Sequence, residues 1–128
     1  MKCKLHVECE FDKEILVDIL SGATYGSYWL EIQADEDIYQ TYREDGDCIE
    51  DVWAKILLSG NSLKAIDQGD DEEAEYAINL SKFKKGINAM ANENIEALAR
   101  ILDNDGDADF YDYDSLIQCV IFGETIYG

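Results

Sequence analysis

Apolar and polar residues alternate along the beginning of the chain. Apolar side chains occupy the odd positions from 3 to 11, and Lys, His and Glu stand between them. A repeat of two is typical of a strand that buries one face. The pattern therefore predicts a strand over residues 3–11 with its odd-numbered side chains in the core, and a similar alternation predicts a second strand over residues 28–34.

Apolar residues spaced three and four apart predict helices in the same half of the chain. Asp12 is placed to cap a short amphipathic helix that Gly22 ends. Residues 49–57 form a helical stripe with Gly60 after it, although the alternation within residues 52–58 leaves a strand as the alternative. The acidic stretch over residues 35–51 is expected to be mostly an exposed loop.

The second half of the chain shows a hairpin followed by helices. Strand patterns over residues 62–67 and 75–80 flank the acidic tip QGDDEEA. Ser81 is placed to cap the next helix, and another helix follows Asn92. A last helix is expected after the acidic block DNDGDADFYDYD, and Gly123 ends it.

This order of elements predicts a single acidic α+β domain over residues 1–128. It should contain a mixed or antiparallel sheet of about four strands with helices packed on it. The side chains expected in the core include Cys3, Leu5, Val7, Leu30, Ile32, Ile56, Ile78, Leu116 and Val120.

Acidic residues greatly outnumber basic ones. The chain has 29 Asp and Glu against 10 Lys and Arg, which gives a formal net charge of −19. Such a field repels nucleic acid and anionic membranes and attracts basic surfaces, so neither nucleic acid nor a membrane is an expected partner. Because the chain has no long apolar run and no signal-peptide pattern, we predict a cytoplasmic protein.

The chain offers little for catalysis. Its one histidine, His6, lies on the polar face of the first predicted strand, with no Ser or Cys placed beside it as a nucleophile. The four cysteines show no C-x-x-C spacing, which favours reduced, buried thiols. We therefore predict a protein that is not an enzyme and that carries no cofactor.

The acidic block at residues 103–114 is similar to the calcium-binding loop of an EF-hand. Ala108 stands where that loop needs glycine for a sharp turn, and the last position is an aspartate where a longer glutamate closes the loop. An acidic, solvated turn is the favoured interpretation, and a small cation-binding or regulatory module remains the alternative. The candidate metal ligands would be Asp103, Asp105, Asp107 and Asp114.

Rows of carboxylates suggest a different function. They occur at residues 35–51, 70–75 and 103–114, separated by ordinary hydrophobic elements. Duplex DNA carries one negative charge about every 1.7 Å along its axis, so such rows can occupy a basic groove in place of DNA. The alternative is that the acidity serves only solubility. The residues expected to contact a partner are Asp70, Asp71, Glu72, Glu73, Asp105, Asp107, Asp109 and Asp112.

Several short motifs carry a resemblance to a known family. They are Gln118 with the ending FGETIYG, the run VDIL, the pair Tyr28 and Trp29, and INLSKFKKGI at residues 78–87. Together they resemble a family of small uncharacterised proteins encoded by bacteriophages and mobile elements.

The resemblance implies a phage setting, in which small acidic proteins often disarm host defences that bind nucleic acid. It brings no catalytic residues. We therefore predict a non-enzymatic anti-defence inhibitor that acts in the host cytoplasm as a nucleic-acid mimic. Its partner would be a basic nucleic-acid-binding protein of the host, either a defence nuclease or, as the first choice, a CRISPR effector.

Overall fold

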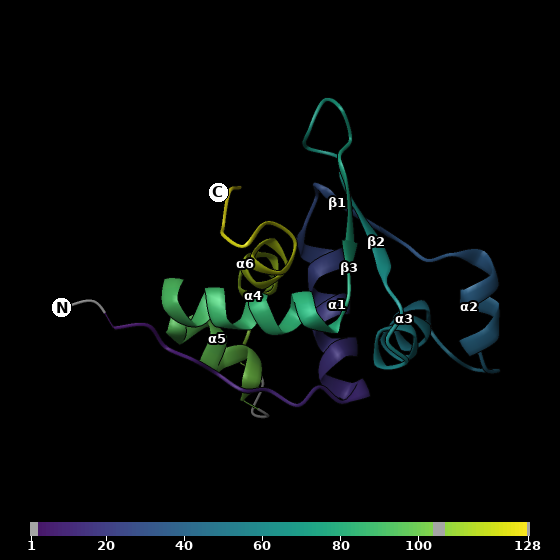
Figure 1. Ribbon diagram of the computed structural model, residues 1–128, viewed down its shortest axis with the longest axis horizontal. Helices are drawn as coiled ribbons and strands as arrows, with labels where there is room; N and C mark the ends of the chain where they lie inside the picture. The colour runs from purple at the N-terminus through teal and green to yellow at the C-terminus, as the bar shows by residue number, and fades with distance from the viewer. Residues whose placement is uncertain (1–2, 104–106, 128) are drawn as a thin grey trace.

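Helices make up most of the part of the chain that the computed structural model describes, residues 3–103 and 107–127 (Figure 1). The elements are, in chain order, α1 (Lys13–Gly26), β1 (Leu30–Gln33), α2 (Glu36–Tyr42), α3 (Ile49–Leu58), β2 (Leu63–Asp67), β3 (Glu75–Ile78), α4 (Leu80–Glu93), α5 (Ile95–Leu102) and α6 (Phe110–Phe122).

The strands form an antiparallel sheet in the order β1-β2-β3. Leu30 of β1 lies opposite Asp67 of β2, and Leu63 of β2 lies opposite Ile78 of β3. The α+β fold is therefore confirmed. The expectation of about four strands was wrong for the described residues, which form a sheet of three.

The sheet buries one face and exposes the other. Leu30, Ile32 and Leu63 are buried among the helices, whereas Glu31 and Lys64, which alternate with them, are exposed. This is the usual arrangement of an antiparallel sheet with one solvated face. The predicted core residues that are buried are Leu30, Ile32, Ile56, Ile78, Leu116 and Val120.

The predicted first strand is absent. Residues 3–11 belong to no sheet, and they run as an extended arm along α4 (Figure 1). Cys3 and Leu5 are exposed and Val7 is only half-buried, so their prediction as core residues was wrong. The physical reason is that amide side chains of α4 take the place of a neighbouring strand: Asn92 and Asn88 hydrogen-bond to the backbone of Leu5 and Val7.

The helix predicted for residues 49–57 is confirmed as α3, and the strand alternative is excluded. Elsewhere the boundaries differ. Helix α2 forms inside the stretch predicted as a loop, because the side chain of Asp35 accepts a hydrogen bond from the amide of Ile38 at its N-terminus. Helix α4 begins before Ser81, with Asn79 as its capping residue.

Two glycines allow helices to approach closely. Helix α1 continues through Gly22 to Gly26, and the ring of Tyr113 in α6 lies where a side chain at Gly22 would stand. Gly22 was predicted to end the helix, and its role is instead to make room for α6. Gly86 of α4 does the same, because a Cβ there would lie 2.7 Å from the Cα of Val120 in α6.

We expect the substitution Gly86→Ala to lower the free energy of unfolding by about 1–3 kcal/mol. In an open helix position the same change is stabilising, since alanine has the higher helix propensity. Here the added methyl group meets the backbone of α6, which cannot rotate away as a side chain would. Urea denaturation gives the change, with Lys85→Ala on the exposed side of α4 as the control. A more stable Gly86→Ala protein would contradict the close packing of α4 and α6.

Candidate partner-binding surface

The hairpin that joins β2 to β3 extends well beyond the helices (Figure 1). Its turn is built by Asp70, whose side chain accepts a hydrogen bond from the amide of Glu72 (3.1 Å) and whose carbonyl accepts one from the amide of Glu73 (2.9 Å). Asp71, Glu72 and Glu73 are exposed, and none of them forms an ion pair with a described Lys or Arg. The hairpin tip, residues 70–73, thus presents carboxylates on an internally hydrogen-bonded turn.

The base of the hairpin is held by the C-terminal segment. Asp67, the last residue of β2, is only 4% exposed. Its carboxylate accepts hydrogen bonds from the amide of Gly69 (2.9 Å) and from the hydroxyl of Tyr127, which lies 2.8 Å from each oxygen. This hydrogen bond to Asp67 is the main reason why the pKa of Tyr127 is raised to about 12. The side chain of Tyr127 therefore links the C-terminal segment to the turn that carries the tip.

Gln118 fixes the C-terminal segment in turn. This side chain is fully buried, and its oxygen accepts hydrogen bonds from the amides of Ile126 and Tyr127, each at 2.8 Å. Its nitrogen donates to Asp114 at 2.8 Å. The rings of Trp29 and Tyr127 pack with their centroids 5.3 Å apart. The motifs around Trp29 and Gln118 that stood out in the sequence thus form one connected support beneath the hairpin.

Asp114, a candidate metal ligand, belongs to this support. One carboxylate oxygen accepts hydrogen bonds from the hydroxyl of Ser27 (2.6 Å) and the indole of Trp29 (2.8 Å), and the other accepts from Gln118. A cation bound by Asp114 would have to displace buried donors. In the described part of the chain no three His, Cys, Asp or Glu side chains are grouped to hold a metal ion. Of the other candidate ligands, Asp103 and Asp107 are exposed, and Asp105 lies outside the described residues.

Two aspartates of the second predicted row, Asp109 and Asp112, hold α6 in place. Asp112 is 5% exposed and accepts two hydrogen bonds of 2.8 Å from the guanidinium of Arg100 in α5. These hydrogen bonds are the main reason why the pKa of Asp112 is lowered. Asp109 caps α6 by accepting from the amide of Asp112. The expectation that Asp112 faces outward was therefore wrong, and Asp107 is an exposed member of this row.

Sequence reasoning missed a second acidic surface. Glu10, Glu14 and Asp18 line a groove of about 310 Å³ together with Asp103, which lies at the end of α5. Tyr113 forms part of its wall, and burial followed by the charge of Asp18 raises the pKa of this hydroxyl. Because this groove depends on α1 and the end of α5 lying together, the only signal in the sequence was the spacing of Glu14 and Asp18 by one helical turn.

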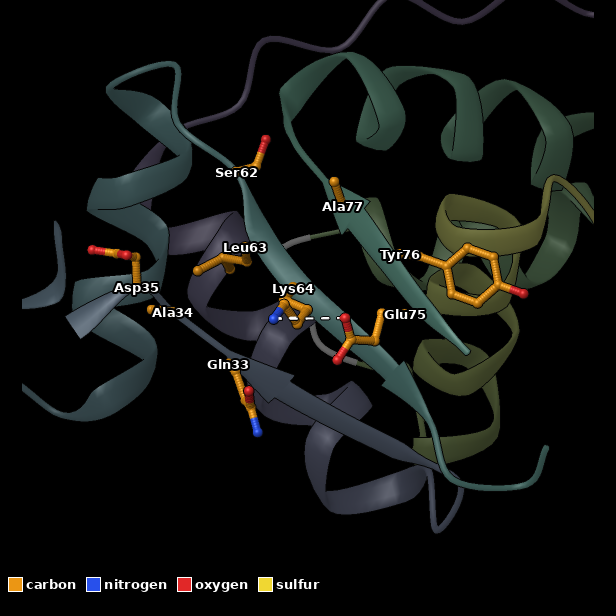
Figure 2. A pocket seen from close by; sticks show the side chains of 9 residues that line it. All are labelled: Gln33, Ala34, Asp35, Ser62, Leu63, Lys64, Glu75, Tyr76 and Ala77. Atoms are coloured by element: carbon orange, nitrogen blue, oxygen red, sulfur yellow. Dashed lines mark ion pairs between the residues drawn. The ribbon is translucent and has the colours of Figure 1, made fainter. Parts of the chain in front are cut away.

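A larger hollow of about 470 Å³ lies beside the exposed face of the sheet (Figure 2). Lys64 and Glu75 form an ion pair of 3.7 Å across neighbouring strands there, and the ring of Tyr76 points away from the hollow toward α6. The hollow has no group of converging carboxylates, since Asp35 and Glu75 stand at opposite ends of its lining. The hollow is therefore a weaker candidate for binding a basic partner than the hairpin tip, where Asp71, Glu72 and Glu73 are exposed side by side.

Comparison with known proteins returned no matching family model, no matching curated protein and no matching solved structure. The resemblance to phage-encoded proteins accordingly stays a prediction. Among the helices of residues 3–103 and 107–127, none combines the length and the apolar character needed to cross a membrane.

Proposed function

We propose that this chain is a non-enzymatic, phage-type inhibitor that binds the basic groove of a host nucleic-acid-binding protein. The hairpin tip enters the groove, and its carboxylates take the place of phosphates. The partner is a defence nuclease or a CRISPR effector in the cytoplasm of the host. The partner side chains that recognise the tip are Lys and Arg, as in a groove that binds duplex DNA.

The observation that carries this proposal is the exposure of Asp71, Glu72 and Glu73 on a projecting, hydrogen-bonded turn (Figure 1). Like charges so close together are unfavourable, and the described cations that could offset them are absent from the tip. A basic partner removes this unfavourable energy on binding. Because the turn is already ordered, little conformational entropy is lost in the complex.

The net charge of −19 supports the same partner class. A strongly negative protein is attracted to a basic surface over about 8 Å at physiological salt. This attraction accelerates association with basic partners and disfavours association with neutral or acidic ones. Asp107 and the groove carboxylates contribute to this field without having to touch the partner.

A capture experiment tests the proposal. The purified protein is immobilised and exposed to a bacterial lysate from which nucleic acid has been digested. One sample of the retained proteins is then eluted with salt, and a parallel sample is eluted with short duplex DNA. We expect nucleic-acid-binding proteins to be released by both, with the affinity falling about tenfold or more between 0.05 and 0.2 M salt. Retained proteins that resist both salt and DNA would contradict charge-based mimicry of nucleic acid.

A further inference from the structure

The N-terminal arm, residues 3–11, has one hydrogen-bonded edge and one open edge. On the α4 side, Asn92 bonds to both the amide and the carbonyl of Leu5 (2.7 and 2.9 Å), and Asn88 does the same for Val7 (2.7 and 3.0 Å). In an extended chain the backbone groups of successive residues point to opposite edges. Those of residues 4, 6 and 8 therefore point away from α4, and none hydrogen-bonds to another described residue.

An open edge of this kind is a template for another strand. Two asparagines hold the arm in its extended form, so pairing does not have to order it. The arm is exposed along most of its length, and Leu5 retains 49% of its accessible surface.

The arm is complementary to itself when a second copy runs antiparallel with His6 opposite His6. Lys4 then faces Glu8 of the second copy, and Glu8 faces Lys4 of the second copy, so both cross-strand pairs are of opposite charge. On the other positions Leu5 faces Val7 of the second copy, and Cys3 faces Cys9 of the second copy. Apart from the central His6 pair, each pair in this register therefore joins opposite charges or two apolar side chains.

The backbone is compatible with this register, because it requires that the residues facing the open edge pair with one another. In an antiparallel pair, hydrogen-bonded positions alternate with positions that exchange no hydrogen bond. If His6 pairs with itself as a hydrogen-bonded position, then residues 4 and 8 are the next hydrogen-bonded positions. These are the residues whose backbone groups point away from α4. Charge pattern and backbone geometry are therefore compatible with the same register.

We propose that two copies of this chain associate through their N-terminal arms, which form a two-stranded antiparallel ribbon centred on His6. Helix α4 of each copy flanks the ribbon on its outer edge, through Asn88 and Asn92. The ribbon is short, so the dimer belongs to the weak, small-interface class. This association is independent of the proposed inhibitor function, because the hairpin tip takes no part in it.

Charge reversal tests the register. The variant Lys4→Glu places Glu opposite Glu8 of its own second copy, and Glu8→Lys places Lys opposite Lys4. In an equimolar mixture of the two variants, both cross-strand pairs are again of opposite charge. By sedimentation equilibrium we expect each variant alone to dimerise at least about tenfold more weakly than the unmodified chain, and the mixture to regain the original dimerisation constant. Circular dichroism checks that the variants fold.

The same measurement distinguishes the ribbon from simple charge repulsion. Glu8→Lys makes each copy less negative, so if repulsion between whole molecules controlled association, this variant would dimerise more tightly than the unmodified chain. If the ribbon forms, Glu8→Lys should dimerise more weakly than the unmodified chain. Tighter self-association of Glu8→Lys, a mixture that fails to recover, or an unmodified chain that stays monomeric at about 1 mM would overturn the proposal.

Cysteine cross-linking provides a second readout. Residues opposite each other without hydrogen bonds in an antiparallel pair have Cα atoms about 4.5 Å apart, which a disulfide can span. After Cys48→Ser removes the other exposed thiol, mild oxidation with diamide should join Cys3 of one copy to Cys9 of the other. Mass spectrometry of the dimer should find this linkage, and a predominance of Cys3 joined to Cys3 would contradict the register.

Discussion

The substitution Gln118→Leu should lower the free energy of unfolding by about 3 kcal/mol or more. Leucine is similar in size to glutamine but has neither donor nor acceptor. The amides of Ile126 and Tyr127 would lose their acceptor, and Asp114 would lose one of its donors. Each unsatisfied buried group costs about 1–3 kcal/mol, so the sum is large for a chain of this size.

Urea denaturation measures this effect, and Gln33→Leu on the exposed face of the sheet is the matched control, with an expected change within about 0.5 kcal/mol. Hydrogen exchange adds a local readout, because the amides of Ile126 and Tyr127 should lose protection in the Gln118 variant. If Gln118→Leu were as stable as the control, the C-terminal segment would not be held by Gln118 as described.

The spacing of apolar residues correctly predicted those elements that depend on contacts between residues close together in the sequence. The hairpin of β2 and β3 and the helix α3 appear where the pattern placed them, because turn residues and an apolar stripe act over short distances along the chain. The arm shows the limit of this reasoning. Alternation indicates which residues share a face, but the arm's backbone is bonded by Asn88 and Asn92, which lie far away in the sequence.

The acidic block shows why the candidate site could be predicted only in part. Its aspartates look alike in the sequence, yet Asp109 caps a helix, Asp112 pairs with Arg100, and Asp114 binds Trp29. The spacing of Asp109 and Asp112 fits a capping box and was a readable signal. The other two roles arise from packing between α5, α6 and the segment before β1, which no local pattern reveals.

The acidic groove likewise forms through packing between segments that are far apart in the sequence. Glu14 and Asp18 lie on the polar face of α1, which the helical period indicates. That Glu10 and Asp103 join them depends on how the arm and the end of α5 meet α1. The hairpin tip was predicted correctly as an acidic turn because its position follows from the two strands beside it.

Neutralising the hairpin tip should weaken binding to the captured partner by roughly 10- to 100-fold. The variant combines Asp71→Asn, Glu72→Gln and Glu73→Gln, which keep the shape of the side chains and remove their charge. Asp70 is left unchanged, because its carboxylate accepts the amide of Glu72 and holds the turn. Each single exposed charge contributes only about 0–1 kcal/mol, so single substitutions should have little effect.

The control removes the same number of charges from the groove, through Glu10→Gln, Glu14→Gln and Asp18→Asn. These residues are exposed, and they lie on α1 and the arm, away from the hairpin (Figure 1). Both variants therefore have the same net charge. Any difference between them reflects where the charges stand.

The most direct test of nucleic-acid mimicry by the hairpin is a competition experiment with labelled duplex DNA bound to the captured partner. The complex is titrated in the same buffer with the unmodified chain, the tip variant and the groove variant. We expect the unmodified chain to displace the DNA and the groove variant to do so nearly as well, whereas the tip variant should require roughly 10- to 100-fold higher concentrations. Equal losses in the two variants would leave net charge as the only cause, and undiminished displacement by the tip variant would contradict nucleic-acid mimicry by the hairpin.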